Sequence, residues 1–305
     1  MFRSVVLLVV ATCLGGEPLA ASPACAQGDL PGTVTSSTAA TGSHAFTRDL
    51  DGGGDVDWTA VGLSAGVSKQ FDPDFSAGMS LRYAEEDWHF GGSGPWRGAA
   101  PWEQLQRPSV ALSTSLGLWR SLRVGVSPTL EWAYDSKADA SDALIYGGVV
   151  SVAMVFTPRF TLGGGAGVTR QFYNVKTSPF VIVDWRLTDR LRLANAVPAG
   201  PEGAAGVELR FAATPDWEIA AGGVSRSDRF RLTARGAGKG DVGETSGIPL
   251  LARVSRRFPS KSRLDVYAGV MANGKLTIRD ADGNARVKET CDTAPALAAT
   301  LSREF

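Results

Sequence analysis

The sequence predicts an all-β chain that folds as an antiparallel transmembrane β-barrel. Three observations predict this fold. Apolar residues alternate with small or polar residues in one run after another, which marks strands with a single apolar face. Short and long connectors between the runs follow each other in strict alternation, and aromatic residues gather near both kinds of connector. A barrel that crosses a membrane combines short turns on one side, longer loops on the other and aromatic girdles at both interfaces.

The stretch 156–193 shows the repeating unit, two alternating runs joined by a polar connector. Tight turns at 157–159 and 188–190 flank the unit, and Pro or Asp supplies their turn chemistry. The apolar parity of the two runs comprises Phe160, Leu162, Ala166, Val168, Val181, Val183, Trp185, Leu187, Leu191 and Leu193. We expect Val181, Val183 and Leu193 to meet lipid. The unit resembles one hairpin of a bacterial outer-membrane barrel.

Connector lengths predict the number of strands. The short connectors lie at 71–75, 119–122, 157–159, 188–190, 214–217 and 259–262. The longer connectors lie at 48–55, 91–107, 135–143, 173–178, 198–203, 235–246 and 280–293. The runs between them lie at 56–70, 75–90, 108–119, 122–134, 144–156, 160–172, 179–187, 191–197, 204–213, 217–233, 247–258, 263–279 and 295–305. A chain that starts and ends in the periplasm needs an even number of strands. Thr33–Phe46 is therefore the expected first strand, which gives fourteen strands, with twelve as the alternative.

Aromatic residues mark two interfaces. Those near the long connectors are Tyr83, Trp88, Phe90, Trp132, Tyr134, Tyr146, Phe172 and Phe230. Those near the short turns are Phe71, Phe75, Trp119, Phe156, Phe160, Trp185, Phe211, Trp217, Phe258 and Phe305. Aromatic girdles of this kind occur at both faces of membrane barrels. The terminal Phe305, preceded by alternating apolar residues, resembles the signal read by the barrel-assembly machinery, although Arg303 departs from that pattern.

The N-terminus predicts export. Residues 1–26 have the pattern of a secretory signal peptide, with Arg3, an apolar core at 5–14 and the small-x-small site at 24–26. The apolar core is too short for a spanning helix, which needs about 20 apolar residues. Residues 27–305 then form the barrel domain, in which Cys291 is an unpaired thiol. The chain carries 31 basic and 31 acidic residues, a balance that argues against a nucleic-acid partner.

Two longer stretches carry a more specific resemblance. Residues 188–195 and 198–209 are similar to a bacterial outer-membrane barrel family known only as a domain of unknown function. Residues 274–276 and 292–295 resemble the final hairpin of that family. The resemblance implies the barrel fold and an outer-membrane location, with lipid and the barrel-assembly machinery as partners. It brings no activity, cofactor or catalytic residue with it.

The inward parity differs between the two halves of the chain. In the first half it is small and neutral: Ser64, Gly66, Ser68, Ser76, Gly78, Ser80, Ser113, Ser115, Gly117, Ser127, Thr129, Gly163, Gly165 and Gly167. In the second half it is charged: Asp184, Arg186, Arg192, Glu208, Arg210, Glu218, Arg229, Arg231, Arg253, Arg257 and Asp265. One interpretation is a lumen braced by ion pairs, since buried charges need partners. The other is a wet channel whose arginine-rich wall favours anions. The two interpretations are compatible.

The connector 91–107 is the longest external loop, and it contains Trp96 and Trp102. Tryptophans gain free energy when they leave water. We therefore expect the loop either to fold inward and narrow the lumen or to pack over the outer rim.

No enzymatic activity is predicted. The glycine run at 163–167 lacks the helix and the Lys-Ser/Thr of a phosphate-binding loop. His44 and His89 are the only histidines, and neither belongs to a recognisable metal or nucleophile motif. We expect no cofactor and no metal. The favoured function is a passive channel or transport barrel for small solutes, anionic or amphipathic, and the alternative is a non-conducting structural or surface-binding barrel.

Overall fold

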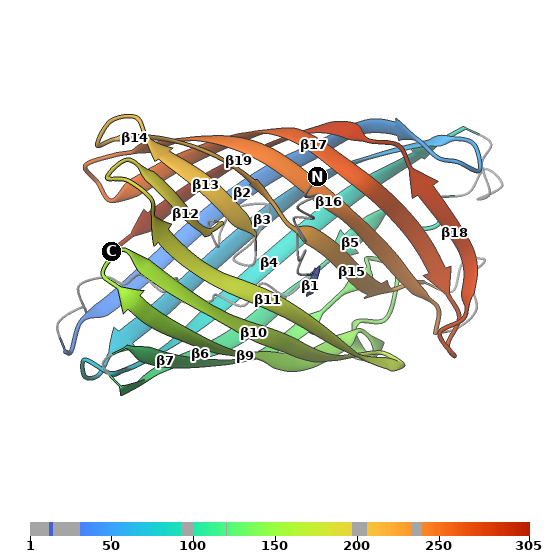
Figure 1. Cartoon of the computed structure of the whole chain (residues 1–305). Helices are drawn as coiled ribbons and strands as arrows, with labels where there is room; N and C mark the ends of the chain where they lie inside the picture. The colour runs from blue at the N-terminus through green and yellow to red at the C-terminus, as the bar shows by residue number, and fades with distance from the viewer. Residues whose placement is uncertain (1–11, 15–30, 93–99, 120, 197–205, 234–239) are drawn as a thin grey trace, which may run out of the picture.

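The computed structural model describes residues 12–14, 31–92, 100–119, 121–196, 206–233 and 240–305. Within them the chain forms a closed antiparallel barrel, which Figure 1 shows from the side. Its wall consists of fourteen long strands. Consecutive long strands are neighbours in the wall, and the last one pairs with the first to close it. The long strands are β2 (Val34–Asp49), β3 (Asp55–Gln70), β4 (Phe75–Gly91), β6 (Ser109–Trp119), β7 (Leu122–Trp132), β9 (Leu144–Thr157), β10 (Phe160–Gln171), β11 (Asn174–Arg186), β12 (Leu191–Asn195), β13 (Val207–Ala212), β14 (Trp217–Gly223), β16 (Val242–Arg257), β17 (Ser262–Arg279) and β19 (Ala294–Glu304).

The all-β barrel and its fourteen strands are confirmed. β2 is the first strand that the even-number rule required at 33–46. One predicted loop is wrong, because β10 and β11 pair along their whole length from Phe160↔Trp185 to Gln171↔Asn174. Only Phe172 and Tyr173 turn the chain, with Phe172 at a φ of 54°. The polar residues at 174–178 belong to β11 and not to a long connector.

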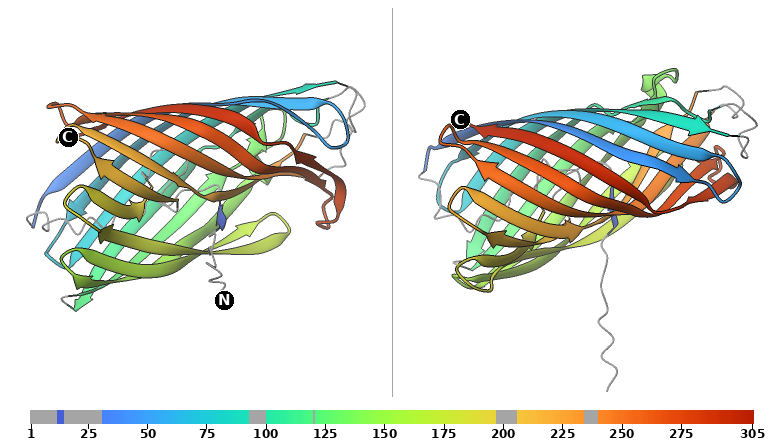
Figure 2. Two further views of the ribbon diagram at one scale, coloured as in Figure 1. Left: turned by 45° about the horizontal axis from the view of Figure 1, so that its top comes forward. Right: turned by 90° about the horizontal axis from the view of Figure 1, so that it is seen from above.

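The outer end, where the long connectors lie, is a narrower ring of strands. Its additional elements are β5 (Gln104–Gln106), β8 (Tyr134–Asp135), β15 (Ser225–Arg231) and β18 (Ala285–Cys291). β5 pairs with β4 and β8, and β8 meets β15 at the pair Arg231↔Tyr134. β18 pairs with β17 and reaches the end of β2 through a bridge between Leu50 and Cys291. Figure 2 shows the barrel from two further sides, with the tip of the β10–β11 hairpin at this end.

Two further elements complete the described structure. β1 (Thr12–Leu14) lies in the expected leader and pairs in parallel with the start of β15. A single turn of 3-10 helix, η1 (Ala140–Asp142), is the one helical element in the described part of the chain. No helix there is long and apolar enough to span a membrane.

The apolar face of β3 and β4 points outward in the middle of the barrel and inward at the outer end. In the middle of β3 and β4 the apolar Val61, Leu63 and Leu81 point outward and are exposed. Their neighbours on the inward parity are mostly small, with Gly62, Ser64 and Ser80 among them and Arg82 as the charged exception. Towards the outer end of β4 the outward positions become polar, and the inward positions become Trp88 and Phe90. The lipid-facing band therefore ends near Tyr83, and the outer end is built like a water-soluble barrel.

The aromatic girdles are only partly as expected. At the inner end Phe156, Phe160 and Trp185 form a row, with ring centroids 5.5 Å apart for each neighbouring pair. At the outer side Tyr83 and Tyr146 are exposed at the edge of the apolar band. Other aromatics near the long connectors, such as Trp88 and Phe230, are buried inside the outer end instead. The reason is that the strands continue beyond the lipid band, where an apolar side chain is stable only inside.

The seam between β11 and β12 is the shortest contact between long strands. β11 pairs with β10 through twelve residue pairs and with β12 through three. The Asn195 side chain extends the seam, since its Oδ1 accepts a hydrogen bond from the Val183 backbone N–H at 3.0 Å. Val183 is 7 % exposed, so the expectation that it meets lipid is wrong, whereas Val181 is 36 % exposed. Leu193 is partly buried in the same seam.

A charge at Val181 should destabilise the barrel far more than a charge at an inward position. Val181→Arg places a guanidinium against lipid, which lowers the unfolding free energy by about 2–4 kcal/mol at mid-membrane depth. Ser115→Arg points toward the small-residue interior and should lower it much less. Urea unfolding in lipid vesicles measures both changes, and equal losses would contradict the assignment of the two faces.

Candidate functional site: the barrel lumen

The lumen has a wall of small side chains. It comprises Ser64, Gly66, Ser68, Ser76, Gly78, Ser80, Ser113, Ser115 and Gly117, on β3, β4 and β6. Eight strands already enclose an interior just wide enough for side chains to fill, and the diameter grows with strand number. A barrel of fourteen strands is therefore wider than its side chains alone require, and serine and glycine line this side of it. The prediction of a small, neutral inward parity in this part of the chain agrees with the fold.

The opposite wall carries a buried ion-pair network centred on Arg253. This residue lies on β16 and is 1 % exposed. Its Nη2 donates to Glu208 Oε2 at 2.6 Å and to Glu218 Oε1 at 3.0 Å. Its Nη1 donates to Asp265 Oδ1 at 3.1 Å. β13, β14, β16 and β17 each contribute one of these four groups, so the network ties four consecutive strands together.

Further arginines complete the network. Arg263 donates to Asp265 at 2.8 Å and to Glu218 at 3.2 Å, and Arg210 lies 3.1 Å from Glu208. Arg257, largely exposed near the inner end, pairs with Glu218 at 3.3 Å. Each of these arginines thus has a carboxylate partner. This arrangement favours the interpretation of a braced lumen over that of an anion-selective arginine wall.

The remaining predicted lumen charges lie elsewhere. Arg192 pairs with Asp184 through two hydrogen bonds at 2.6 and 2.5 Å, next to the β11–β12 seam. Arg186 is exposed at the inner end of β11. Arg229 and Arg231 lie on the face of β15 opposite Phe230, over the rings of Tyr173 and Phe172 at 5.8 and 4.5 Å. The prediction that Arg229 and Arg231 point into the lumen is therefore wrong, because the buried Phe230 occupies the inward face of β15.

Arg229 belongs to a second ion cluster at the outer end. Glu244 Oε2 lies 3.3 Å from Arg229 Nε and accepts a hydrogen bond from Arg279 Nε at 2.8 Å. Burial by itself raises the pKa of Glu244, but the hydrogen bond from Arg279 and the two positive charges outweigh it and hold that pKa below its usual value. Glu244 therefore stays ionised, and the cluster anchors the β10–β11 hairpin tip to β15 through Arg229 and Tyr173.

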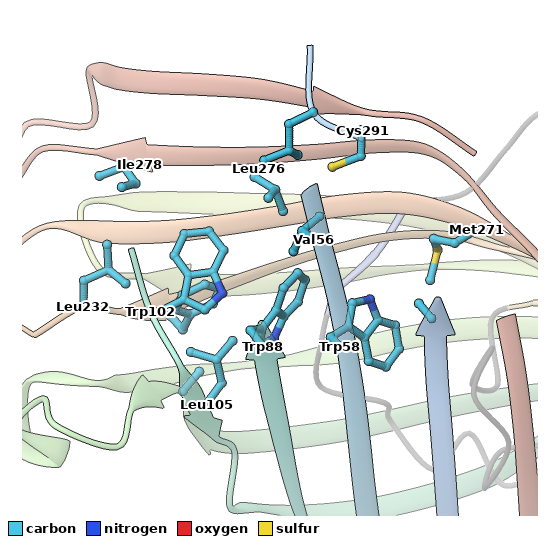
Figure 3. Close-up of a cluster of buried hydrophobic side chains, with 14 of the residues drawn as sticks. Val56, Trp58, Trp88, Trp102, Leu105, Leu232, Met271, Leu276, Ile278 and Cys291 are labelled. Carbon is cyan, nitrogen blue, oxygen red and sulfur yellow. The ribbon is translucent and has the colours of Figure 1, made fainter. Parts of the chain in front are cut away.

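A buried cluster rich in aromatic rings, here called the aromatic core, lies at the outer end, and Figure 3 shows Trp58, Trp88 and Trp102 within it. Trp102, which is 1 % exposed, packs edge-on against Trp88, Phe90 and Phe230 at centroid distances of 5.8, 5.3 and 5.0 Å. Trp58 stacks on Trp88 at 5.9 Å. Residues from β3, β4, β15 and β17 and from the chain before β5 meet here. Trp102 is thus folded inward, and Trp96 lies outside the described residues.

Arg107 forms a buried ion-pair cluster near this core. Arg107 was not identified as a structural residue from the sequence. Its guanidinium donates to Glu131 Oε1 on β7 from Nε at 2.8 Å, and its Nη1 lies 3.0 Å from Asp228 Oδ1 on β15. All three side chains are buried. The bonds fix β15 against β7 across the narrow ring. The available signal was a lone arginine between a polar loop and an apolar run, which is common at strand ends.

The C-terminal residue Phe305 is held by the first strand at the inner end of the barrel. The Phe305 backbone N–H donates to the Ser36 carbonyl at 2.9 Å, and its ring is exposed. Arg303 lies 4.7 Å over that ring, so the residue that departs from the expected pattern stacks on the terminal aromatic.

At the outer rim His89 is mostly exposed and lies 3.3 Å from Asp57, while His44 lies 2.9 Å from Thr59 Oγ1.

Solved membrane barrels are similar to this chain at low sequence identity. An outer membrane channel from Pseudomonas putida F1 is 11 % identical, covers 93 % of this chain and 99 % of its own, and has a TM-score of 0.49. The toluene transporter TodX of Pseudomonas putida is 11 % identical, with 88 % and 89 % coverage and a TM-score of 0.47. A FadL homologue of Pseudomonas aeruginosa is 10 % identical, with 89 % and 90 % coverage and a TM-score of 0.34.

Sequence comparison assigns the family. No curated protein matches the chain. One family model matches residues 111–281, which is more than half of the 305 residues and spans the wall from β6 to β17. The match includes the ion-pair network and the strands beside the aromatic core. The chain belongs to the family described as "Domain of unknown function (DUF6268)".

Proposed function

We propose that this protein is an outer-membrane transport barrel for small amphipathic solutes. In this proposal residues 1–26 direct export and are removed, β1 leaves with them, and the barrel-assembly machinery inserts residues 27–305. The exposed apolar band between two aromatic girdles supports the membrane location. Cell fractionation tests it, and recovery of the protein from the soluble periplasm would contradict it.

One observation carries the proposal of transport. In this proposal the lumen beside the small-residue wall ends at the aromatic core around Trp102 and Trp88, which is a cluster of buried side chains at the outer end. A purely structural barrel has no need of free interior space, whereas a transport barrel needs both space and a barrier that keeps it closed at rest. Indole rings next to serine and threonine side chains offer a solute both apolar and polar contacts. The paired state of Arg253 and its neighbours leaves amphipathic solutes favoured over simple anions.

The conductance of the purified protein in planar bilayers tests this function. The wild-type barrel should conduct weakly because the aromatic core obstructs the axial path. The double variant Trp88→Ala/Trp102→Ala should conduct several times more. Trp119→Ala removes an exposed tryptophan at the inner girdle and is the matched control, for which no change is expected. A double variant that folds but conducts no better than wild type would contradict a lumen closed by this core.

A non-conducting structural barrel is the second candidate, and the ion-pair network favours it. Ion pairs between Arg253 and its carboxylate partners link four neighbouring strands and so stabilise the wall of the barrel. Absence of conductance in both wild type and the double variant, together with no uptake of amphipathic solutes into vesicles, would select this candidate. We propose no catalytic activity for either barrel.

A further inference from the structure

Arg48 is a buried cation whose position is set by a β-bulge. The pairing of β2 with β3 shifts between Ala45 and Arg48, and both intervening residues are exposed. Bulges re-aim side chains in this way. The bulge turns Arg48 into the outer end, where it is 6 % exposed. Gly274 on β17 leaves room for it, because a Cβ at that glycine would lie 3.0 Å from Arg48 Nη1.

The guanidinium of Arg48 lacks a counter-charge among the described residues. Its Nε and Nη1 find no hydrogen-bond acceptor there. Burial lowers the pKa of Arg48, and the ionisable group that acts on it most closely is the Cys291 thiol. Arg107 and Arg253 are equally buried, yet each lies within 3.0 Å of at least two carboxylates. A buried cation without such compensation strongly destabilises a fold, so the position of Arg48 points to a bound partner.

A small cavity adjoins Arg48. Its volume is about 30 Å³, and its lining includes Arg48, Trp58, Trp88 and Met271. Since roughly 10–15 Å³ of such space holds one water molecule, the cavity has room for a small ion or for one carboxylate group. The two indole rings and the thioether provide an apolar side next to the cation. The cavity therefore presents a positive group and an apolar surface together.

The acidic residues of the cavity are already engaged. Glu86 accepts a hydrogen bond from Trp88 Nε1 at 3.1 Å and lies 3.8 Å from Arg226. Asp228 lies 3.0 Å from Arg107 and 3.0 Å from Arg226. Neither carboxylate pairs with Arg48. Both carboxylates of the cavity are thus engaged by Arg107, Arg226 or Trp88, and the guanidinium of Arg48 is left without a carboxylate partner among the described residues.

We propose that the Arg48 cavity binds a small anionic group. Two sources share this chemistry, a free monovalent anion of halide size and the carboxylate of an amphipathic solute that lies against Trp58 and Met271. This inference goes beyond transport, because binding can be measured at equilibrium whether or not the barrel conducts.

Titration of the purified, detergent-solubilised barrel tests the proposal and separates the two sources. Sodium chloride, sodium hexanoate and 1-hexanol are added at constant ionic strength with sodium gluconate, whose anion is too large for the cavity. The thermal unfolding midpoint and tryptophan fluorescence are followed. A saturable rise with chloride identifies a free anion, and a saturable response to hexanoate alone identifies a carboxylate solute. No saturable response to either, or an equal response to 1-hexanol, overturns the proposal.

Variants assign the response to Arg48. Arg48→Met should weaken anion binding by about tenfold or more, because a charge-assisted hydrogen bond is lost. Arg186→Met removes an exposed arginine at the inner end and should bind like wild type. If Arg48→Met does not fold, Met271→Glu provides an internal carboxylate beside the cavity, which should raise the unfolding midpoint at low salt and abolish the response. A wild-type response in either Arg48→Met or Met271→Glu overturns the proposal.

Discussion

Replacement of Arg253 by alanine is expected to lower the unfolding free energy of the barrel by about 3–5 kcal/mol. The substitution leaves Glu208, Glu218 and Asp265 facing one another without the guanidinium that lies within 3.1 Å of each. Both Arg253 and Asp265 are buried, so water does not screen the repulsion that results. Urea unfolding in lipid vesicles, followed by the heat-dependent mobility of the barrel on gels, measures the loss.

Two variants define the origin of that loss. Arg257→Ala removes an arginine that is 55 % exposed in its side chain and has a single partner, so its effect should be small. Arg253→Met combined with Glu208→Gln removes charge from both partners and should regain part of the stability, because fewer buried charges are left unpaired. If Arg253→Ala and Arg257→Ala destabilise the barrel equally, the network does not brace the wall.

Replacement of Trp102 by alanine should destabilise the outer end by about 3–5 kcal/mol, the usual loss for a large aromatic side chain in a core. Trp102 contacts three other aromatic rings and is fully enclosed, so its removal leaves a cavity in the aromatic core of the outer end. The loss should be local. Limited trypsin digestion should cut the outer connectors faster while the membrane-spanning part keeps its heat-dependent mobility.

Trp119 provides the comparison for this variant. It is 73 % exposed at the inner girdle, and Trp119→Ala should leave the digestion of the outer connectors unchanged. Equal digestion of Trp102→Ala and wild type would mean that the connector before β5 is held in place by contacts other than the aromatic core.

Most of the wall could be predicted from alternation and turn chemistry. The turns at 157–159 and 188–190 fix the inner ends of β9 to β12, because Thr, Pro and Asp leave few other backbone conformations. Apart from Val183, which is buried in the β11–β12 seam, the failures lie at the outer end. The polar residues at 174–178 look like a loop, yet they pair with β10 because a two-residue turn at Phe172 and Tyr173 suffices.

The lumen was harder to predict than the wall. Parity reports which residues share a face, but not which face is inside once a strand leaves the membrane. On β4 the sequence does carry the signal, since Asp87 and His89 alternate with Trp88 and Phe90. The bonds of Arg107 and the orientation of Arg48 depend on strands far away in the sequence and on a bulge. Neither feature produces a periodic pattern within one strand, so neither could be predicted from the alternation of residues.

The exchange of faces along β3 and β4 means that one strand is stabilised by two different solvents. Near Leu63 and Leu81 the apolar side chains are in contact with hydrocarbon, whereas Trp58 and Trp88 on the same strands are withdrawn from water. Detergent that replaces lipid acts on the first segment, and urea, which weakens burial away from water, acts on the second. The two halves of a continuous hydrogen-bonded ladder can thus be weakened independently by the choice of medium.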